Sequence, residues 1–174
     1  MCHKKKIVLF DMDGVLVKYV PEHYKGEDPI YFHKGIHFFR NLQADETACA
    51  LFNALARDGY DCYVLSRVSE KEDCVEEHTA DKMIWLENHF PNLAKDHIII
   101  STKSKPEALA DHGLTIGENT ILIDDFNPNL NDWGEDGGIP IKYLNGVNSP
   151  ESFSGLKLSS ESSVDELKNI IERI

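Results

Sequence analysis

The chain has 174 residues and a mass of 19.7 kDa, the size of one domain with room for a small insertion. Hydrophobic residues make up 41% and charged residues 28%, which is ordinary for a globular protein. The formal net charge of -12 argues against a nucleic-acid backbone as the main partner, because such a partner requires basic patches. It is compatible with a phosphorylated small molecule, since a metal ion and a lysine can reverse the field inside a cleft.

No segment of the sequence approaches the length of a membrane helix, so we expect no membrane partner. The apolar run after the basic residues 1–6 is too short for the core of a signal peptide. The four cysteines have neither metal-binding nor disulfide spacing: Cys2, Cys49, Cys62 and Cys74. We therefore expect reduced thiols in a cytoplasmic protein.

Apolar runs predict five strands along the chain, at residues 6–10, 60–65, 97–100, 120–123 and 139–143. Pro140 suggests that the fifth strand lies at a sheet edge, because proline has no N–H to donate. Helical patterns lie between several of these runs. This alternation predicts an α/β fold with a parallel, three-layered sheet.

Capping residues mark the clearest helices. Asp45 can cap a helix that Gly59 ends. Residues 76–89 carry apolar side chains at helical spacing. Ser104 opens a capping box, and Ser163 opens the last helix.

The stretch from 17 to 44 breaks the alternation, because it is too long for a strand-to-helix turn and is rich in aromatic residues. We interpret it as a small cap insertion in a core domain formed by residues 1–16 and 45–174. Residues 145–162 are rich in Asn, Ser and Gly and indicate an irregular loop.

Two aspartate pairs directly follow apolar strands: Asp11 and Asp13 after the first, Asp124 and Asp125 after the fourth. The carboxyl ends of parallel strands are where such sheets bind ligands. Four carboxylates gathered there would raise one another's pKa, so a cation is expected among them. A hard divalent ion with oxygen ligands, Mg²⁺ in the first place, fits this requirement.

Residues 11–15 (DMDGV) resemble the first signature of the haloacid dehalogenase-like (HAD) phosphohydrolases. The other signatures follow in order: Ser66 ends the second predicted strand, Lys105 opens a helix after the third, and Asp124 and Asp125 end the fourth. Within this superfamily the chain is most similar to the 5'(3')-deoxyribonucleotidases, over most of residues 6–144.

The resemblance implies a Rossmann-like core, a Mg²⁺ ion and hydrolysis of phosphate monoesters through an aspartyl-phosphate. Asp11 would be the nucleophile. Asp13 would protonate the leaving oxygen and then activate water. The metal would be held by Asp11, the backbone carbonyl of Asp13 and Asp125, with Asp124 binding directly or through water.

Other residues would bind the substrate. Ser66 would donate to a phosphate oxygen, and Lys105 would offset the negative charge. Lys103 competes for the second role, but the capping box favours Lys105. Phe38 and Phe39 are either core residues or stack on the substrate.

Three departures from the deoxyribonucleotidases bear on the substrate. The insertion is shorter than their helical cap, so fewer walls surround a nucleobase. Lys18 stands where these enzymes tend to have an acid. Arg67 stands where a small hydroxyl residue is usual, and it could contact a second anionic group.

Some polar residues have simpler interpretations. His33 and His37 have helical spacing but lack the rest of a zinc motif. The acidic residues between 70 and 77 are expected to form a solvated face. Asn129 is interpreted as a turn or cap residue, with orientation of a metal ligand as the alternative.

We expect a phosphomonoesterase of 5'-nucleotidase type that acts on (deoxy)ribonucleoside monophosphates. A catalytically idle nucleotide- or phosphate-binding protein of the same fold is one alternative. Another is a HAD phosphatase for a different small or macromolecular ester, although an acidic surface is poor for nucleic acid. In a homo-oligomer, a neighbouring subunit could close the cleft that a small cap leaves open.

Overall fold

The computed structural model describes residues 6–174, which form a six-stranded sheet in the order β3-β2-β1-β4-β5-β6. Every neighbouring pair of strands is parallel. The strands are β1 (Ile7–Phe10), β2 (Asp61–Arg67), β3 (Ile98–Ser101), β4 (Thr120–Asp124), β5 (Ile139–Leu144) and β6 (Leu156–Ser159). The α/β, Rossmann-like parallel fold expected from the sequence is thereby confirmed.

The helices alternate with the strands along the chain. They are α1 (Pro21–Tyr24), α2 (Glu46–Arg57), α3 (Glu72–His89), α4 (Lys105–Asp111), α5 (Asn127–Glu135) and α6 (Val164–Glu172). Short 3-10 turns are η1 (Ile30–Phe32), η2 (Phe38–Asn41), η3 (Lys95–His97) and η4 (Pro150–Ser152). The predicted caps are present: Asp45 accepts from an amide of α2, and Ser104 and Ser163 form complete capping boxes.

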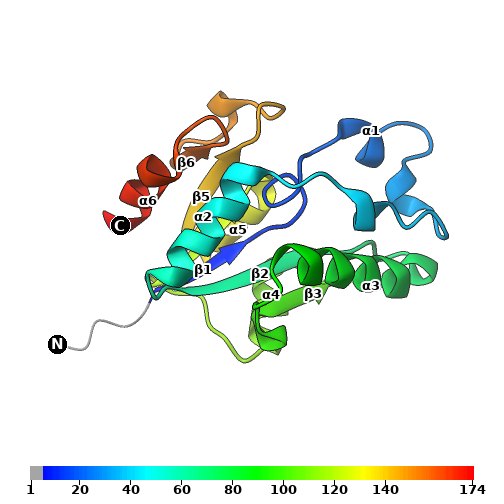
Figure 1. The fold of residues 1–174 in the computed structure, drawn as a ribbon, viewed down its shortest axis with the longest axis horizontal. Helices are drawn as coiled ribbons and strands as arrows, with labels where there is room; N and C mark the ends of the chain where they lie inside the picture. The colour runs from blue at the N-terminus through cyan, green and yellow to red at the C-terminus, as the bar shows by residue number, and fades with distance from the viewer. Residues whose placement is uncertain (1–5) are drawn as a thin grey trace.

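Helices cover both faces of the sheet (Figure 1), and an apolar cluster lies between the sheet and each helical layer. Helices α2, α3 and α6 contribute to the cluster that contains Val8, Phe10 and Ile123. Helices α4 and α5 contribute to the other cluster, which contains Leu9 and Leu122. Neighbouring residues of β1 and β4 thus face opposite layers, as the two-residue period of a strand requires. Both central strands are buried on both faces.

The C-terminal part of the sheet differs from the sequence prediction. Residues 145–162 are not wholly irregular, because they contain β6. Pro140 consequently does not lie on an edge strand, since β5 pairs with both β4 and β6. The pairing with β6 begins only at Ile141, one residue after the proline, so the missing N–H disturbs little of that ladder. Helix α5 was also not predicted.

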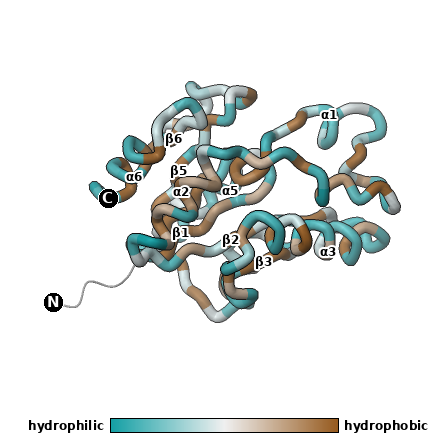
Figure 2. Tube along the Cα trace, in the orientation of Figure 1, coloured by the Kyte–Doolittle hydropathy of each residue, from teal (hydrophilic) through white to brown (hydrophobic). Residues whose placement is uncertain are grey.

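Helix α3 begins at Glu72, earlier than the expected residue 76. It is mostly teal in Figure 2, whereas α6 alternates between teal and brown. The polarity of α3 extends to its buried side, where His78, Asp81 and Lys82 are almost fully enclosed. A helix that buries charged residues must give them partners.

The stretch from 17 to 44, which we call the 17–44 segment, contains α1, η1 and η2. In Figure 1 it lies to the right, away from both termini, with η2 packed on α3. The backbone N–H of Gly35 donates to Glu77 (2.8 Å), so this acid is not simply solvated as expected. Arg40 and His37 contact Asp81. His37, Glu77 and Asp81 lie close enough to suit a metal, but these polar contacts already link α3 to the segment.

Among residues 6–174 we find no helix with the length and apolar character that crossing a membrane requires. The cysteines of this range, Cys49, Cys62 and Cys74, form no disulfide. Cys2 lies outside the described residues.

Candidate active site

The two aspartate pairs meet at the carboxyl edge of the sheet because β1 and β4 are neighbours. Phe10 lies opposite Ile123, and the N–H of Asp11 donates to the carbonyl of Ile123 (2.9 Å). The strand order reverses at this point, which is where open parallel sheets form binding crevices. The ligand atoms of Asp11, Asp124 and Asp125 all lie within 4.8 Å of one another.

Gly14 permits the close approach of the two loops. Its φ of +83° lies in the left-handed region that glycine tolerates. A Cβ atom at this position would overlap the carboxylate of Asp125. The turn after β1 therefore depends on a residue without a side chain.

Burial and mutual repulsion make this set of acids costly to ionise. Burial raises the pKa of Asp125 to about 8, and the carboxylates of Asp124 and Asp11 add to the shift. Burial raises the pKa of Asp11 to about 7, although Lys105 opposes the shift. Excess negative charge of this kind favours a bound cation.

Lys105 lies among the aspartates, and Lys103 does not. As the first residue of α4, Lys105 is buried and its Nζ lies 2.8 Å from Asp11 Oδ1 and 3.0 Å from Asp124 Oδ2. Burial acts to lower the pKa of Lys105, but the two carboxylates outweigh it and the net shift is upward. Lys103 instead forms an exposed ion pair with Asp111 (2.5 Å).

Protein donors already surround Asp124. Oδ1 accepts from the N–H of Phe126 (2.8 Å), and Oδ2 accepts from Asn129 (2.9 Å) as well as from Lys105. The alternative role of Asn129, orienting an acid of the site, therefore matches its position. Asp125 accepts from the side chain of Asn145 (2.9 Å), a residue that sequence reasoning missed.

The donor set fits Mg²⁺. Carboxylate and carbonyl oxygens are the ligands that this ion prefers. Asp11 and Asp125 are the carboxylates least occupied by protein donors, and Asp124 fits a role through water better than direct coordination. The Asp13 carboxylate is turned to other partners, so only its backbone carbonyl is a candidate ligand.

Asp13 lies between two donors from different parts of the chain. Tyr24 of α1 donates its hydroxyl to Oδ1 (2.9 Å), and Lys82 of α3 forms an ion pair with Oδ2. Burial and the nearby Asp13 carboxylate raise the pKa of Tyr24 well above its usual value, so the phenol stays protonated. Neither Tyr24 nor Lys82 was among the residues expected at the site.

Of the remaining residues expected at the site, one lines the hollow around Asp11 and the others do not. Arg67 lines the hollow around Asp11, whereas Ser66 is buried and accepts from Lys82 (2.9 Å). The hydroxyl proton of Ser66 is then free to donate elsewhere. Phe38 and Phe39 lie in the apolar core beside α2 and α3 and do not line the hollow, so the core interpretation describes their position.

The hollow around the aspartates has a volume of about 370 Å³. Three of its four aromatic lining residues, Tyr19, Tyr24 and Tyr31, come from the 17–44 segment. The fourth is Phe126, at the start of α5. The rings of Tyr19 and Tyr24 are stacked, with centroids 5.1 Å apart. The 17–44 segment thus lines the hollow with tyrosines rather than with the two phenylalanines considered from the sequence.

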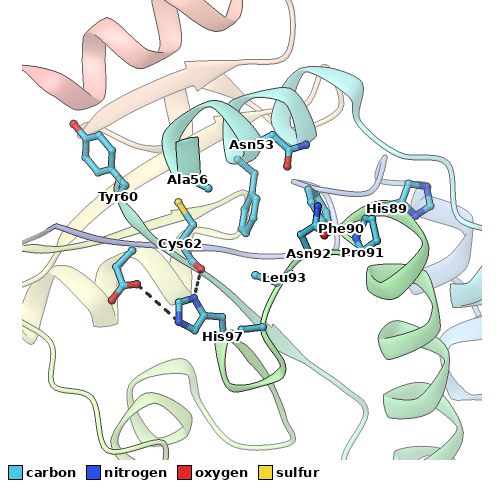
Figure 3. A pocket seen from close by; sticks show the side chains of 13 residues that line it. Asn53, Ala56, Tyr60, Cys62, His89, Phe90, Pro91, Asn92, Leu93 and His97 are labelled. Carbon is cyan, nitrogen blue, oxygen red and sulfur yellow. Dashed lines mark hydrogen bonds and ion pairs between the residues drawn. The ribbon is translucent and has the colours of Figure 1, made fainter. Parts of the chain in front are cut away.

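A second hollow of about 430 Å³ lies at the opposite, amino end of β2 (Figure 3). Tyr60, Asn53 and His97 line it. His97 Nδ1 lies 3.0 Å from the carbonyl of Cys62, and its ring stacks on Tyr63. None of the expected site residues lies there, and the amino edge of a parallel sheet is not the usual ligand edge.

Comparison with known proteins gives structural matches only. Neither a protein-family model nor a curated protein matches the sequence. A D,D-heptose 1,7-bisphosphate phosphatase from Burkholderia thailandensis has a TM-score of 0.65 and 13% identity, over 96% of this chain and 99% of its own. The corresponding phosphatase from B. bronchiseptica, in complex with magnesium and phosphate, has a TM-score of 0.64 and 11% identity, over 97% and 99%.

A HAD hydrolase of family IA, variant 3, from Entamoeba histolytica has a TM-score of 0.61 and 18% identity, over 97% of this chain and all of its own (100%). At such identities the likeness concerns the fold. The chain shares the fold of these three solved structures over nearly its whole length.

Proposed function

We propose that the protein is a Mg²⁺-dependent phosphomonoesterase of the HAD type, which acts through an aspartyl-phosphate. The observation that carries this proposal is the grouping of the buried Asp11 and Lys105 with the partly buried Asp125 at the carboxyl edge of the sheet. A nucleophile, a positively charged side chain and a further carboxylate that can help to hold a metal ion are the parts that phosphoryl transfer requires.

Each residue has a role that its surroundings support. Asp11 attacks phosphorus, while Lys105 holds its carboxylate and offsets the charge of the phosphoryl group. Asp13 gives a proton to the leaving oxygen and later takes one from water. Asp11, Asp125 and the carbonyl of Asp13 would hold Mg²⁺, which neutralises charge on the phosphate oxygens when it is bound.

The substrate that we propose is a small phosphate ester, in the first place a (deoxy)ribonucleoside monophosphate. The hollow of about 370 Å³ is within the size range of small-ligand sites. Its tyrosines offer ring faces and hydroxyls to a sugar or a base. Arg67, at the same wall, could bind a second anionic group, which keeps a bisphosphate as the alternative substrate. We extend the proposal to the 17–44 segment, as the cap of this site.

A catalytically idle binding protein is the competing function. Such a protein would need Lys105 and the metal, but it would have no use for an acid placed as Asp13 is. The position of Asp13 beside Asp11 in the lining of the hollow therefore favours the enzyme.

A phosphate-release assay across nucleoside monophosphates, sugar phosphates and bisphosphates, with and without Mg²⁺, tests the proposal. We expect Mg²⁺-dependent turnover of at least one class and its loss in Asp11→Asn. Binding of these esters with no phosphate release from any of them would support the idle protein instead.

A further inference from the structure

Lys82 is a charged residue that the phosphatase chemistry described above does not use. Its side chain is fully buried, in the middle of α3. Enclosing an ammonium group costs several kcal/mol, on the order of the penalty for one buried ion, unless partners compensate for it. The contacts of Lys82 are therefore informative about what the charge does.

Three oxygens and an aromatic ring surround the ammonium group. It forms an ion pair with Asp13 Oδ2 and donates to Ser66 Oγ (2.9 Å) and to the carbonyl of Arg67 (2.7 Å). The ring of Phe39 lies 4.5 Å from Nζ. Ser66 and Arg67 belong to the end of β2, so a strand of the core fixes Lys82, and Lys82 in turn holds Asp13.

The two oxygens of Asp13 have different surroundings. Oδ2 is turned to the buried Lys82. Oδ1 is turned to Tyr24, whose side chain lines the hollow. With Oδ2 anchored to the interior, the carboxyl group can rotate little, and Oδ1 remains the oxygen beside Tyr24 at the hollow.

We propose that Lys82 is a positioning residue that anchors Oδ2 of Asp13 and so presents Oδ1 to the leaving group. This inference rests on the proposed phosphatase function. In the step that it serves, a bond forms between Asp11 and phosphorus as the bond from phosphorus to the leaving oxygen breaks. Asp13 enters this step protonated at Oδ1, while Oδ2 accepts from Lys82. The proton moves from Oδ1 to the leaving oxygen, and Asp13 is left as a carboxylate, ready to take a proton from water afterwards.

Comparing two esters with different leaving groups shows whether Lys82 positions Asp13 or only stabilises the fold. An alkyl phosphate expels a poor leaving group that needs the proton from Asp13. The p-nitrophenyl ester expels a stable anion that scarcely needs it. A residue that acts through Asp13 must therefore affect the alkyl ester much more, whereas a disturbed fold or a weakened phosphate site would affect both esters alike.

The first experiment measures kcat/KM of Lys82→Met on a nucleoside monophosphate and on p-nitrophenyl phosphate, at saturating Mg²⁺. We expect a loss of about a hundredfold or more on the nucleotide, typical of general acid catalysis, and less than about tenfold on the aryl ester. Equal fold losses on the two esters, or no loss on either, would overturn the inference.

Lys103→Met is the matched control, because Lys103 is a lysine near the same sheet edge whose ion pair with Asp111 is exposed. It should retain wild-type rates on both esters. If the wild-type protein releases phosphate from neither ester, the proposed function itself fails, which is a different result from equal losses in Lys82→Met.

The second experiment adds Lys82→Met to Asp13→Asn. Removing both charges leaves no unpaired ion in the core, so this double variant is expected to fold even if Lys82→Met alone does not. Because Lys82 acts through Asp13, the second substitution should change the residual rate of Asp13→Asn on p-nitrophenyl phosphate by less than about threefold, the non-additivity expected of a unit. A further loss of tenfold or more would show that Lys82 has a separate role and would overturn the inference.

Discussion

The two ends of the parallel sheet both carry hollows, but they differ in what they bury. The hollow at the amino end is the larger of the two, about 430 Å³ against 370 Å³. His97 there contacts a backbone carbonyl, a tyrosine ring and Asp61, and both His97 and Asp61 are only partly buried. The carboxyl end encloses Asp11 and Asp124 with Lys105 between them. Enclosed charge is costly, so its presence, rather than the volume of a hollow, identifies the candidate site.

The largest expected effect at the carboxyl end is that of Asp11→Asn. Removing the nucleophile should lower kcat by at least about a thousandfold, as loss of a nucleophile does in other enzymes. The circular dichroism spectrum should not change, because the amide occupies the same volume. Phosphate release reports the rate, and undiminished turnover would remove Asp11 from its role.

The second largest effect should come from removing the positive charge of Lys105. Lys105→Met leaves Asp11 and Asp124 without their shared partner, so we expect kcat to fall about a hundredfold. We also expect a lower melting temperature, because breaking a buried ion pair typically costs about 3–5 kcal/mol. Steady-state kinetics and thermal denaturation check the two parts, and a variant that loses stability but keeps its rate would restrict Lys105 to a structural role.

Gly14→Ala tests whether the turn after β1 must lack a side chain for Asp125 to keep its place at the site. Gly113→Ala is the matched control, since both glycines have positive φ (+83° and +79°) but only Gly14 would bring its Cβ onto another group, the Asp125 carboxylate. Both variants should lose about 1 kcal/mol of stability from left-handed strain. Only Gly14→Ala should also weaken Mg²⁺ activation, by about tenfold if the displacement of Asp125 costs about 1.4 kcal/mol of binding. Equal Mg²⁺ activation curves for the two variants would contradict this account.

The raised acid pKa values predict a pH-dependent response to Mg²⁺. The pKa of Asp125 is about 8 in the folded protein against 3.8 ordinarily, and that of Asp11 is about 7. Between pH 4 and these values the metal-free folded state holds protons that the unfolded state has released, so stability falls as the pH rises. Mg²⁺ needs the ionised carboxylates and relieves their repulsion.

Mg²⁺ should therefore raise the melting temperature by several degrees at pH 8 and by much less at pH 5, where the acids are protonated. Differential scanning fluorimetry with and without the ion measures the difference. A shift of the same size at both pH values would mean that the ion binds elsewhere.

The smallest effect should come from the amino end. His97→Gln should leave phosphate release within about twofold of the wild type, because His97 lies at the opposite edge of the sheet from the aspartates. A large loss of activity in this variant would break the comparison between the two ends of the sheet.

Some parts of this site could be predicted because short stretches of sequence specify them. The apolar runs before Asp11 and Asp124 are long enough to indicate buried strands, and parallel topology then brings their ends together. The capping box at Ser104 similarly favoured Lys105 over Lys103, because the box fixes where the helix begins. Strand β6 was missed, since its short run beside many Asn, Ser and Gly residues is held by pairing with β5 rather than by its own pattern.

Lys82 could not be recognised as part of the site, because a lysine in a polar helix ordinarily lies in solvent. The sequence by itself determined the alternation of strands and helices, the caps and the two aspartate pairs, all of which depend on near neighbours in the chain. The tertiary structure alone decided which side chains of α3 and of the 17–44 segment reach Asp13. Burial of a charge depends on partners distant in sequence, here 69 residues from Lys82 to Asp13, and no local pattern records such a contact.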